Sequence, residues 1–317
     1  MKIVFMGTPE AAVPTLLRLL ADGHEVVAVY TQPDRPSGRG NKITMSPVKL
    51  AALANDLPVF QPVKIRSQET LDTMRSHQAD AAVVVAYGRI LPPAVLEIFP
   101  KGAINVHFSL LPKYRGAAPV NWAIVNGEKE TGVTTMLMDE GLDTGAILLT
   151  SRTEIGEEET AVELMSRLSQ DGAELLSETL GTFDHITPRS QDNDAATYAP
   201  LLKKEFGNID WSESANAISG KVQGFQPFPT TFTAFRGKKL TIWSAKAVGP
   251  QDGSIPESAP IGTIAFVGKD SFDVVCGGGT VLRIFEVQME GRKRVSSRDL
   301  INSAKPAAGE MLGELAS

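Results

Sequence analysis

The segment "AAVVVAYGRILPPAVLEIFPKGAINVHFS", residues 81–109, contains two short apolar runs, AAVVVAYG and AINVHFS, separated by a stretch of mixed composition. Similar runs, KIVFMG and EVVAVYT, occur earlier, and the helical stretches TLLRLLADG and AALANDLP alternate with them. Apolar runs that alternate with helices are typical of a mostly parallel sheet covered on both faces. The first 150 residues therefore predict a Rossmann-like α/β domain with helices on both faces of the sheet.

The composition and the spacing of apolar residues change in the second half of the sequence. Residues 157–182 have helical apolar spacing, which predicts two helices at the end of the first domain. The sequence becomes polar and rich in proline from about residue 184, as in a linker. Beyond it, apolar and polar residues alternate between glycine turns, which predicts a small β-barrel. We expect a first domain over 1–187, a linker over 188–205 and a second domain over 206–317.

Composition narrows the class of protein. The chain has 317 residues, of which 42% are hydrophobic, and a net charge of −6, so any nucleic acid must bind at local basic patches. No apolar run approaches the roughly 18 residues of a membrane span, and the start lacks the long apolar core of a signal peptide. Cys276 is the single cysteine, and no Cys and His cluster has zinc-site spacing. We expect a cytoplasmic protein with no membrane contact, disulfide or metal.

The run AINVHFS ends in a polar pair. Side chains alternate along a strand, so Asn105 and His107 share one face, and Ile104, Val106 and Phe108 share the other. Ligands of such sheets bind beyond the carboxyl ends of the strands. An imidazole beside a carboxamide can stabilise an oxyanion and transfer a proton near neutral pH. A structural histidine with all its hydrogen bonds made within the core is the alternative reading.

A glycine-flanked acidic loop follows at "DEGLDTG", residues 139–145. A carboxylate of this loop, from Asp139, Glu140 or Asp143, can orient an imidazole or favour its charged form. The spacing of an EF-hand calcium loop is absent. Solvated acidic side chains are the alternative here.

Taken together, "NVHFSLLPKYRGAAP" and "GLDTG" resemble the signature of the folate-dependent formyltransferase family. The segments FMGTPE, YTQPDRPSGRG, VVAYGRILP and PVNWAIVNGE extend the resemblance along the whole chain, and they are most similar to the members that act on methionyl-tRNA. Phe108 departs from the pattern, because relatives commonly carry a small residue or proline there. Since it faces away from the polar pair, we expect altered packing and retained activity.

The resemblance implies that Asn105, His107 and Asp143 form a catalytic triad. The reaction would move a formyl group from 10-formyltetrahydrofolate to the α-amino group of methionine on initiator tRNA. The carboxamide and the imidazole would donate hydrogen bonds to the developing oxyanion, and the carboxylate would orient the imidazole and help to relay a proton. No metal is implied.

The resemblance also implies where the substrates bind. Two segments would line the folate pocket: Arg89, Ile90 and Leu91, and Ser109, Leu110, Leu111 and Pro112. The basic loop at 31–49, with Arg35, Arg39, Lys42 and Lys49, would recognise the acceptor stem of the tRNA. Within it, Arg39 would determine selectivity for the tRNA. By composition alone, the segment 31–49 equally fits a solvated loop. An OB-fold-like second domain would add a basic stripe along the tRNA, made of Lys203, Lys204, Lys238, Lys239, Arg292, Lys293 and Arg294.

Other functions fit parts of the sequence. A formyltransferase acting on a sugar nucleotide shares the catalytic strand, whereas one acting on glycinamide ribonucleotide would need a phosphate-binding turn that "MGTPEAAVP" lacks. An RNA-binding module with a degenerate enzyme domain is disfavoured by the complete polar set. A dinucleotide-dependent dehydrogenase is disfavoured because G-x-G-x-x-G is absent from the first βα unit. The family resemblance implies a monomer.

Overall fold

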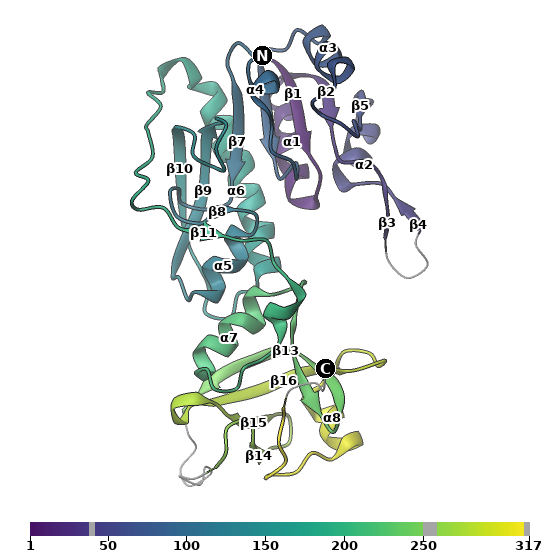
Figure 1. The fold of residues 1–317 in the computed structure, drawn as a ribbon, viewed down its shortest axis with the longest axis vertical. Coiled ribbons are helices and arrows are strands. Elements are labelled where there is room, and N and C mark those ends of the chain that lie inside the picture. The colour runs from purple at the N-terminus through teal and green to yellow at the C-terminus, as the bar shows by residue number, and fades with distance from the viewer. Residues whose placement is uncertain (38–41, 250–258, 314–317) are drawn as a thin grey trace. The chain divides into compact units, whose positions relative to one another are not determined.

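The computed structural model describes residues 1–37, 42–249 and 259–313 (Figure 1). These residues form two compact units. The first unit comprises 1–119, 130–154 and 165–199, and the second unit comprises 120–129, 155–164 and the described residues from 200 onward.

A seven-stranded sheet of order β10-β9-β7-β6-β1-β2-β5 forms the centre of the first unit. The pairs that link β7, β6, β1, β2 and β5 are all parallel, whereas β9 and β10 are antiparallel additions at one edge. The prediction of a mostly parallel sheet is therefore confirmed. Its strands are β1 (Lys2–Gly7), β2 (Glu25–Tyr30), β5 (Val59–Phe60), β6 (Ala81–Val85), β7 (Ala103–His107), β9 (Glu130–Leu137) and β10 (Ile147–Glu154).

Helices cover both faces of this sheet, as predicted. On one face, Val4, Met6 and Val84 pack in a core with Leu71 and Met74 of α3. On the other face, α6 lies against Val106 and Val133. Covering both faces explains why all five residues of β6 are buried. The helices that belong wholly or mostly to this unit are α1 (Val13–Ala21), α2 (Pro47–Ala54), α3 (Gln68–Ser76), α4 (Pro93–Leu96) and α6 (Ala161–Gly181).

The prediction of two helices over 157–182 is wrong, because α6 is one continuous helix of 21 residues. The dipeptide Asp171-Gly172 resembles a turn in the sequence. In the structure, however, a Cβ on Gly172 would lie 2.9 Å from Cγ1 of Val106 and 3.4 Å from the ring of Phe108. Gly172 therefore allows α6 to approach β7 closely, and it does not end the helix.

Short elements complete the described residues around the first sheet. A hairpin of β3 and β4 follows β2, and β8 pairs with β11 in a separate two-stranded parallel sheet. Helix α5 crosses the boundary between the units, because it starts at the last residue of the first segment of the first unit. The bounds are β3 (Arg35–Ser37), β4 (Lys42–Thr44), β8 (Arg115–Gly116), β11 (Tyr198–Ala199), α5 (Pro119–Val125), η1 (Glu10–Ala12) and η2 (Phe183–His185).

The second unit contains an antiparallel sheet of order β12-β13-β16-β15-β14, with β17 paired to β16. Buried residues of this sheet pack against Ile218 and Val222 of α7 and Leu300 of α8. An antiparallel β domain is confirmed, and closure into an OB-fold barrel stays a prediction. The bounds are β12 (Thr231–Phe235), β13 (Lys238–Val248), β14 (Ile264–Val267), β15 (Phe272–Val275), β16 (Val281–Met289), β17 (Val295–Ser296), α7 (Ala215–Gly224), α8 (Ser297–Ala304), η3 (Lys204–Gly207) and η4 (Gly277–Gly279).

Over residues 1–37, 42–249 and 259–313, no helix has the length and apolar character needed to cross a bilayer. The same ranges contain no group of three or more His, Cys, Asp or Glu side chains arranged to hold a metal ion. Cys276 is buried, and burial raises the pKa of its thiol to about 12.

Candidate active site

Strand β7 carries the predicted polar pair at its carboxyl end. Asn105 pairs with Val84 of β6 and Met136 of β9, and His107 is the last residue of the strand and pairs with Thr134. Both side chains are nearly buried: the residues are 8% and 6% exposed, respectively. A central strand flanked on both sides fixes the backbone of this pair, so its orientation does not depend on a mobile loop.

The two nitrogen atoms of His107 have different partners. Nε2 lies 2.9 Å from the carbonyl oxygen of Tyr114, which can only accept, so Nε2 carries a proton. Nδ1 lies 3.7 Å from Oδ2 of Asp143, and this carboxylate is only 13% exposed. The neutral imidazole therefore presents a free lone pair at Nδ1, and a proton gained there would be stabilised by the carboxylate.

Asp143 projects from a turn whose backbone is unusual. Its φ is +53°, in the left-handed region, and its Oδ2 accepts a hydrogen bond of 2.8 Å from the amide of Gly116. Asp139 stabilises the start of the turn, since its Oδ1 accepts from the amide of Gly141 and from the hydroxyl of Thr144. Of the carboxylates predicted as candidates, Asp143 is the one that the fold places beside His107.

The carboxamide of Asn105 is unpartnered. Among the residues that the structure describes, its side chain has no hydrogen bond, although it is almost buried. It is not completely enclosed either, because it is absent from the buried polar atoms that lack a partner. An unpaired amide next to an imidazole and a carboxylate fits an oxygen atom of a ligand, because buried polar groups in proteins are otherwise hydrogen-bonded.

Sequence reasoning missed the side chains that support this centre. Gln191 donates from Nε2 to the carbonyl oxygens of Asp143 and Gly145, at 2.9 and 2.7 Å. Its Oε1 accepts from the guanidinium of Arg115, which is 2% exposed. Gln191 lies in the stretch predicted as a linker over 188–205, and nothing in its polar composition distinguishes a glutamine that contacts the site. The basic Arg115 within "KYRG" was the one available signal.

The first predicted folate segment, residues 89–91, is a turn with free backbone groups. Within the described ranges, its N–H and C=O groups make no hydrogen bond to other backbone groups. Ile90 is 65% exposed, whereas Leu91 is buried in the core. The side chain of Arg89 is held by Oε1 of Gln32 at 3.0 Å and by the carbonyl of Val63 at 2.7 Å. The turn thus presents backbone donors and acceptors of the kind that suit the edge of a pterin ring.

The second predicted folate segment, residues 109–112, is tied into the protein. The hydroxyl of Thr134 donates to the carbonyl of Ser109 at 2.7 Å and accepts from the amide of Leu111 at 3.2 Å. Ser109 is fully buried and donates to the carbonyl of Lys113, so its hydroxyl is already used. Leu111 packs with Met136, while Leu110 and Pro112 are half-buried. This segment supplies mainly apolar surface.

Phe108 faces away from the polar pair, as strand alternation predicts. It is 5% exposed and its ring lies beside Gly172 of α6, on the opposite side of β7 from the polar pair. The bulky ring therefore packs against a helix and does not enter the site, and retained activity stays a prediction.

The predicted tRNA-binding loop is described only in part. Arg35 is exposed in β3, and Lys42 lies in β4, paired in register with Ser37. Arg39 lies outside the described residues. Lys49 is not a free cation, because its Nζ donates to Asp34 at 2.6 Å and to Gln61 at 2.7 Å.

The predicted basic residues of the second unit are mostly exposed. Lys239 is partly buried and lies 3.9 Å above the ring of Phe232. Burial lowers the pKa of Lys239, and the charge of Lys204 lowers it further, so these two lysines share one patch. Arg294 pairs with Glu286 and lies 5.0 Å from the ring of Trp243. Exposed positions are also found for Lys203, Lys204, Lys238, Arg292 and Lys293.

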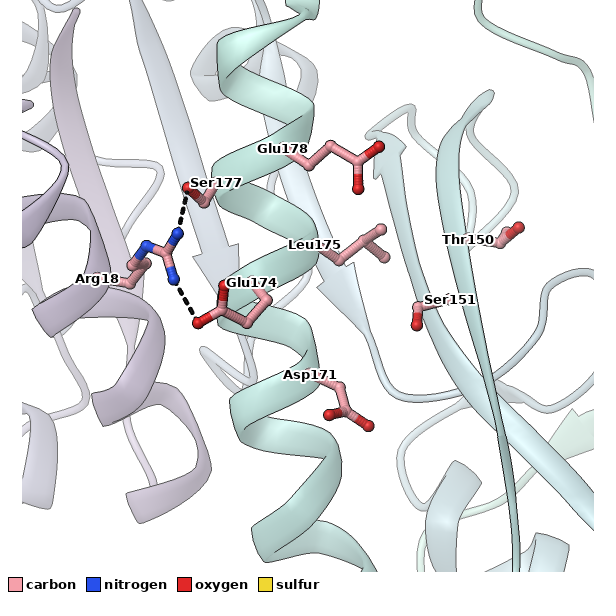
Figure 2. A pocket seen from close by; sticks show the side chains of 8 residues that line it. All are labelled: Arg18, Thr150, Ser151, Asp171, Glu174, Leu175, Ser177 and Glu178. Atoms are coloured by element: carbon pink, nitrogen blue, oxygen red, sulfur yellow. Dashed lines mark hydrogen bonds and ion pairs between the residues drawn. The ribbon is translucent and has the colours of Figure 1, made fainter.

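Two surface pockets of the first unit lie elsewhere. Figure 2 shows one of about 470 Å³, where Arg18 of α1 reaches Glu174 and Ser177 of α6. Its lining contains none of the predicted site residues and is mainly acidic and hydroxylic: Arg18, Thr150, Ser151, Asp171, Glu174, Leu175, Ser177 and Glu178. The other, of about 490 Å³, includes Tyr30, Phe60 and Lys64. Neither pocket brings together an imidazole, a carboxylate and a free amide.

Solved structures share this fold at low sequence identity. An N-formyltransferase from Helicobacter canadensis, in complex with folinic acid and dTDP-3-aminofucose, matches with a TM-score of 0.65 and 19% identity over 91% of this chain and 99% of that chain. HypX from Aquifex aeolicus, in complex with tetrahydrofolic acid, matches with a TM-score of 0.63 and 15% identity over 98% of this chain and 48% of that one. These matches establish the architecture of the chain.

Sequence relatives are much closer. The formyl transferase family model matches residues 1–180, and the model of the formyl transferase C-terminal domain matches 201–305. A methionyl-tRNA formyltransferase of Alkaliphilus oremlandii is 48% identical over 99% of this chain and 100% of its own length, and one of Solibacter usitatus is 49% identical over 99% of both. These findings confirm the family resemblance: the chain belongs to the formyl transferase family, on the branch of the methionyl-tRNA formyltransferases.

Proposed function

We propose that the protein transfers the formyl group of 10-formyltetrahydrofolate to the α-amino group of methionyl initiator tRNA. Relatives that are named for this activity match the chain over its whole length. The single observation that carries the proposal is the unpartnered Asn105 amide beside the His107 and Asp143 pair. Formyl transfer needs a donor for a developing oxyanion and a base for the attacking amine, and this centre offers one of each.

His107 takes the proton of the attacking amine at Nδ1. This atom has a free lone pair, since the proton of the neutral ring is on Nε2 and points to the carbonyl of Tyr114. The carboxylate of Asp143, 3.7 Å away, stabilises the imidazolium that results. Because both groups are largely removed from water, this attraction is stronger than between exposed groups.

Asn105 donates a hydrogen bond to the formyl oxygen as negative charge develops on it. A positioned donor of this type contributes about 3 to 4 kcal/mol to transition-state stabilisation. The sequence resemblance assigns the same role to His107 as well. In the observed geometry the Nε2–H of His107 is directed at Tyr114, so we assign the oxyanion to Asn105 and the proton to His107.

The folate co-substrate supplies the formyl group: the α-amino nitrogen bonds to the formyl carbon, the bond from that carbon to the folate nitrogen breaks, and the departing nitrogen takes the proton that His107 received from the amine. The residues that hold it are the free backbone groups of 89–91 and the apolar surface of Leu110, Leu111 and Pro112. In this assignment Ser109 maintains the loop through its bond to Lys113. The side chain of Arg89 stays bonded to Gln32, and its backbone contacts the ligand.

The remaining basic residues bind tRNA. We assign phosphate contacts to the patch that contains Lys204 and Lys239, and recognition of the acceptor end to the loop with Arg35, Arg39 and Lys42. Exposed lysines and arginines on a chain with a net charge of −6 provide the local attraction that a polyanion requires. In this assignment residues 1–187 carry the catalytic centre and residues 206–317 carry most of the basic patch that binds RNA. Of the segment 188–205 between them, residues up to 199 belong to the first unit. The protein acts as a cytoplasmic monomer.

A formylation assay with competing acceptors tests the function. Purified protein and 10-formyltetrahydrofolate are incubated with methionyl initiator tRNA, methionyl elongator tRNA or an amino-sugar nucleotide. We expect rapid formylation of the initiator species alone. Formylation of the amino sugar with no product from tRNA would assign the protein to the small-molecule formyltransferases.

A further inference from the structure

The segment 189–199 belongs to the first unit and is hydrogen-bonded to it at several positions. Arg189 and Ile147 exchange two backbone hydrogen bonds of 2.8 and 2.9 Å. At the other end of the segment, β11 pairs with β8, which contains Arg115 and Gly116. A Cβ on Gly116 would lie 2.6 Å from the carbonyl oxygen of Ala199, so the backbones of these two strands are in close contact. The segment is therefore fixed on both sides of Gln191.

Both ends of the Gln191 carboxamide are used, and its orientation is determined. Oε1 accepts from Nε and Nη2 of Arg115 at 3.1 and 2.8 Å, and Nη2 also donates to Asn193 at 2.9 Å. A guanidinium can only donate, so it cannot face the amide nitrogen of Gln191. Nε2 of Gln191 must then point to the opposite side, where it meets the carbonyls of Asp143 and Gly145.

These two carbonyls belong to the turn that presents the carboxylate of Asp143. The left-handed backbone of Asp143 is rarely adopted by residues other than glycine, asparagine and aspartate, and such a conformation persists when surrounding contacts hold it. Gly145 approaches the sheet so closely that a Cβ there would lie 1.7 Å from the carbonyl oxygen of Leu137. Gln191 bonds to the turn on both sides of Thr144 and holds it in this position.

We propose that Gln191, oriented by Arg115, is a positioning residue that keeps the carboxylate of Asp143 beside Nδ1 of His107. This inference rests on the proposed function of that site. Gln191 contacts neither reactant; it acts by fixing the turn from which Asp143 projects. Displacement of a catalytic group by about 1 Å can cost about 100-fold in rate.

The variant Gln191→Glu distinguishes a role of Gln191 in positioning Asp143 from a role in the stability of the fold. The new carboxylate still accepts from Arg115, now as an ion pair, but it cannot donate to the carbonyls of Asp143 and Gly145. We expect kcat to fall about 10- to 100-fold, the KM values for both substrates to stay at the wild-type level, and the Tm not to fall. Amide hydrogen exchange should become faster in residues 143–146 and at Gly116, whose N–H is bonded to Asp143.

Gln223→Glu is the matched control. Gln223 of α7 also donates from Nε2 to a backbone carbonyl, that of Glu157, at 2.9 Å, so the variant makes the same chemical change outside the site. It should leave kcat and the exchange of residues 143–146 unchanged. Wild-type kcat together with wild-type exchange in Gln191→Glu would overturn the inference, and so would an equal kcat loss in Gln223→Glu.

A double-mutant cycle with Asp143→Asn tests the route of the effect. If Gln191 acts through Asp143, adding Gln191→Glu to Asp143→Asn should lower the single-turnover rate by less than threefold, which is much less than its effect alone. Multiplication of the two losses would show that Gln191 acts independently and would overturn the inference. A wild-type protein that formylates no tRNA would refute the proposed function instead, and hydrogen exchange would still report whether Gln191 holds the turn.

Discussion

The Asn105, His107 and Asp143 centre of the first unit and the basic patch of the second unit use polar side chains in opposite ways. In the first unit the three residues are nearly buried and fixed by a central strand and a bonded turn. In the second unit Lys204 is exposed and Lys239 is half-buried, and the two repel each other. Catalysis depends on the position of each atom, whereas attraction to a polyanion depends on summed charge. Single substitutions should therefore have large effects in the first region and small effects in the second.

His107→Ala tests the comparison most severely. Loss of the base should lower kcat by about 100- to 10,000-fold, since positioned acid–base groups contribute effects of this size. Affinity for tRNA, measured by filter binding, should stay close to that of the wild type. Turnover comparable to the wild type would show that the buried centre is not the site of reaction.

Asn105→Ala should have the next largest effect. Removal of one oxyanion donor is expected to lower kcat by about 100- to 1,000-fold with little change in KM. Steady-state formylation assays measure both parameters. Asn55→Ala is a control, because it removes a carboxamide from an exposed residue outside the site, where the side-chain amide donates to the carbonyl of Ala51. Equal losses in the two variants would contradict a specific role for Asn105.

Lys204→Ala combined with Lys239→Ala should weaken tRNA binding and leave kcat at saturating tRNA unchanged. Each lost phosphate contact should reduce the slope of log affinity against log salt by about 0.9 for duplex RNA treated like B-DNA. Binding titrations between low and moderate salt measure this slope. A fall in kcat with an unchanged slope would place these lysines in catalysis and remove the contrast between the two regions.

His77→Gln examines a histidine that belongs to neither region and should have the smallest effect. Burial lowers the pKa of His77, whose Nε2 lies 2.9 Å from the hydroxyl of Tyr30. The unfolded chain therefore binds a proton more readily, so the stability that neutral His77 contributes is present above the unfolded pKa of about 6.5 and is lost as the pH falls from there through the lower pKa of the folded state. The variant should show a smaller drop in Tm between pH 7.5 and 5.5, with wild-type turnover at pH 7.5. An unchanged drop would assign acid sensitivity to other groups, such as His24, whose pKa burial also lowers.

The alternation of apolar runs and helices was sufficient to predict the parallel sheet and the shared face of Asn105 and His107. These features depend on local periodicity, which a single sequence displays directly. The prediction of two helices over 157–182 failed, because α6 continues through Asp171-Gly172, a dipeptide with the composition of a turn. The need for a glycine there comes from Val106, which is distant in the chain. Close packing between remote segments has no local signature.

The features of the candidate site also divide into those that the sequence determines and those that depend on tertiary structure. The sequence by itself determined that an amide and an imidazole lie at the carboxyl end of a strand, because strand geometry assigns their faces. The composition of the acidic loop left three carboxylates open, and the family resemblance selected Asp143. Only the tertiary structure brought Asp143 beside His107 and showed that Gln191 and Arg115 bond to its turn. Those contacts depend on where three segments that are distant in the sequence meet in the folded unit. Strand periodicity is encoded residue by residue, whereas such a crossing is encoded by the packing of the whole unit.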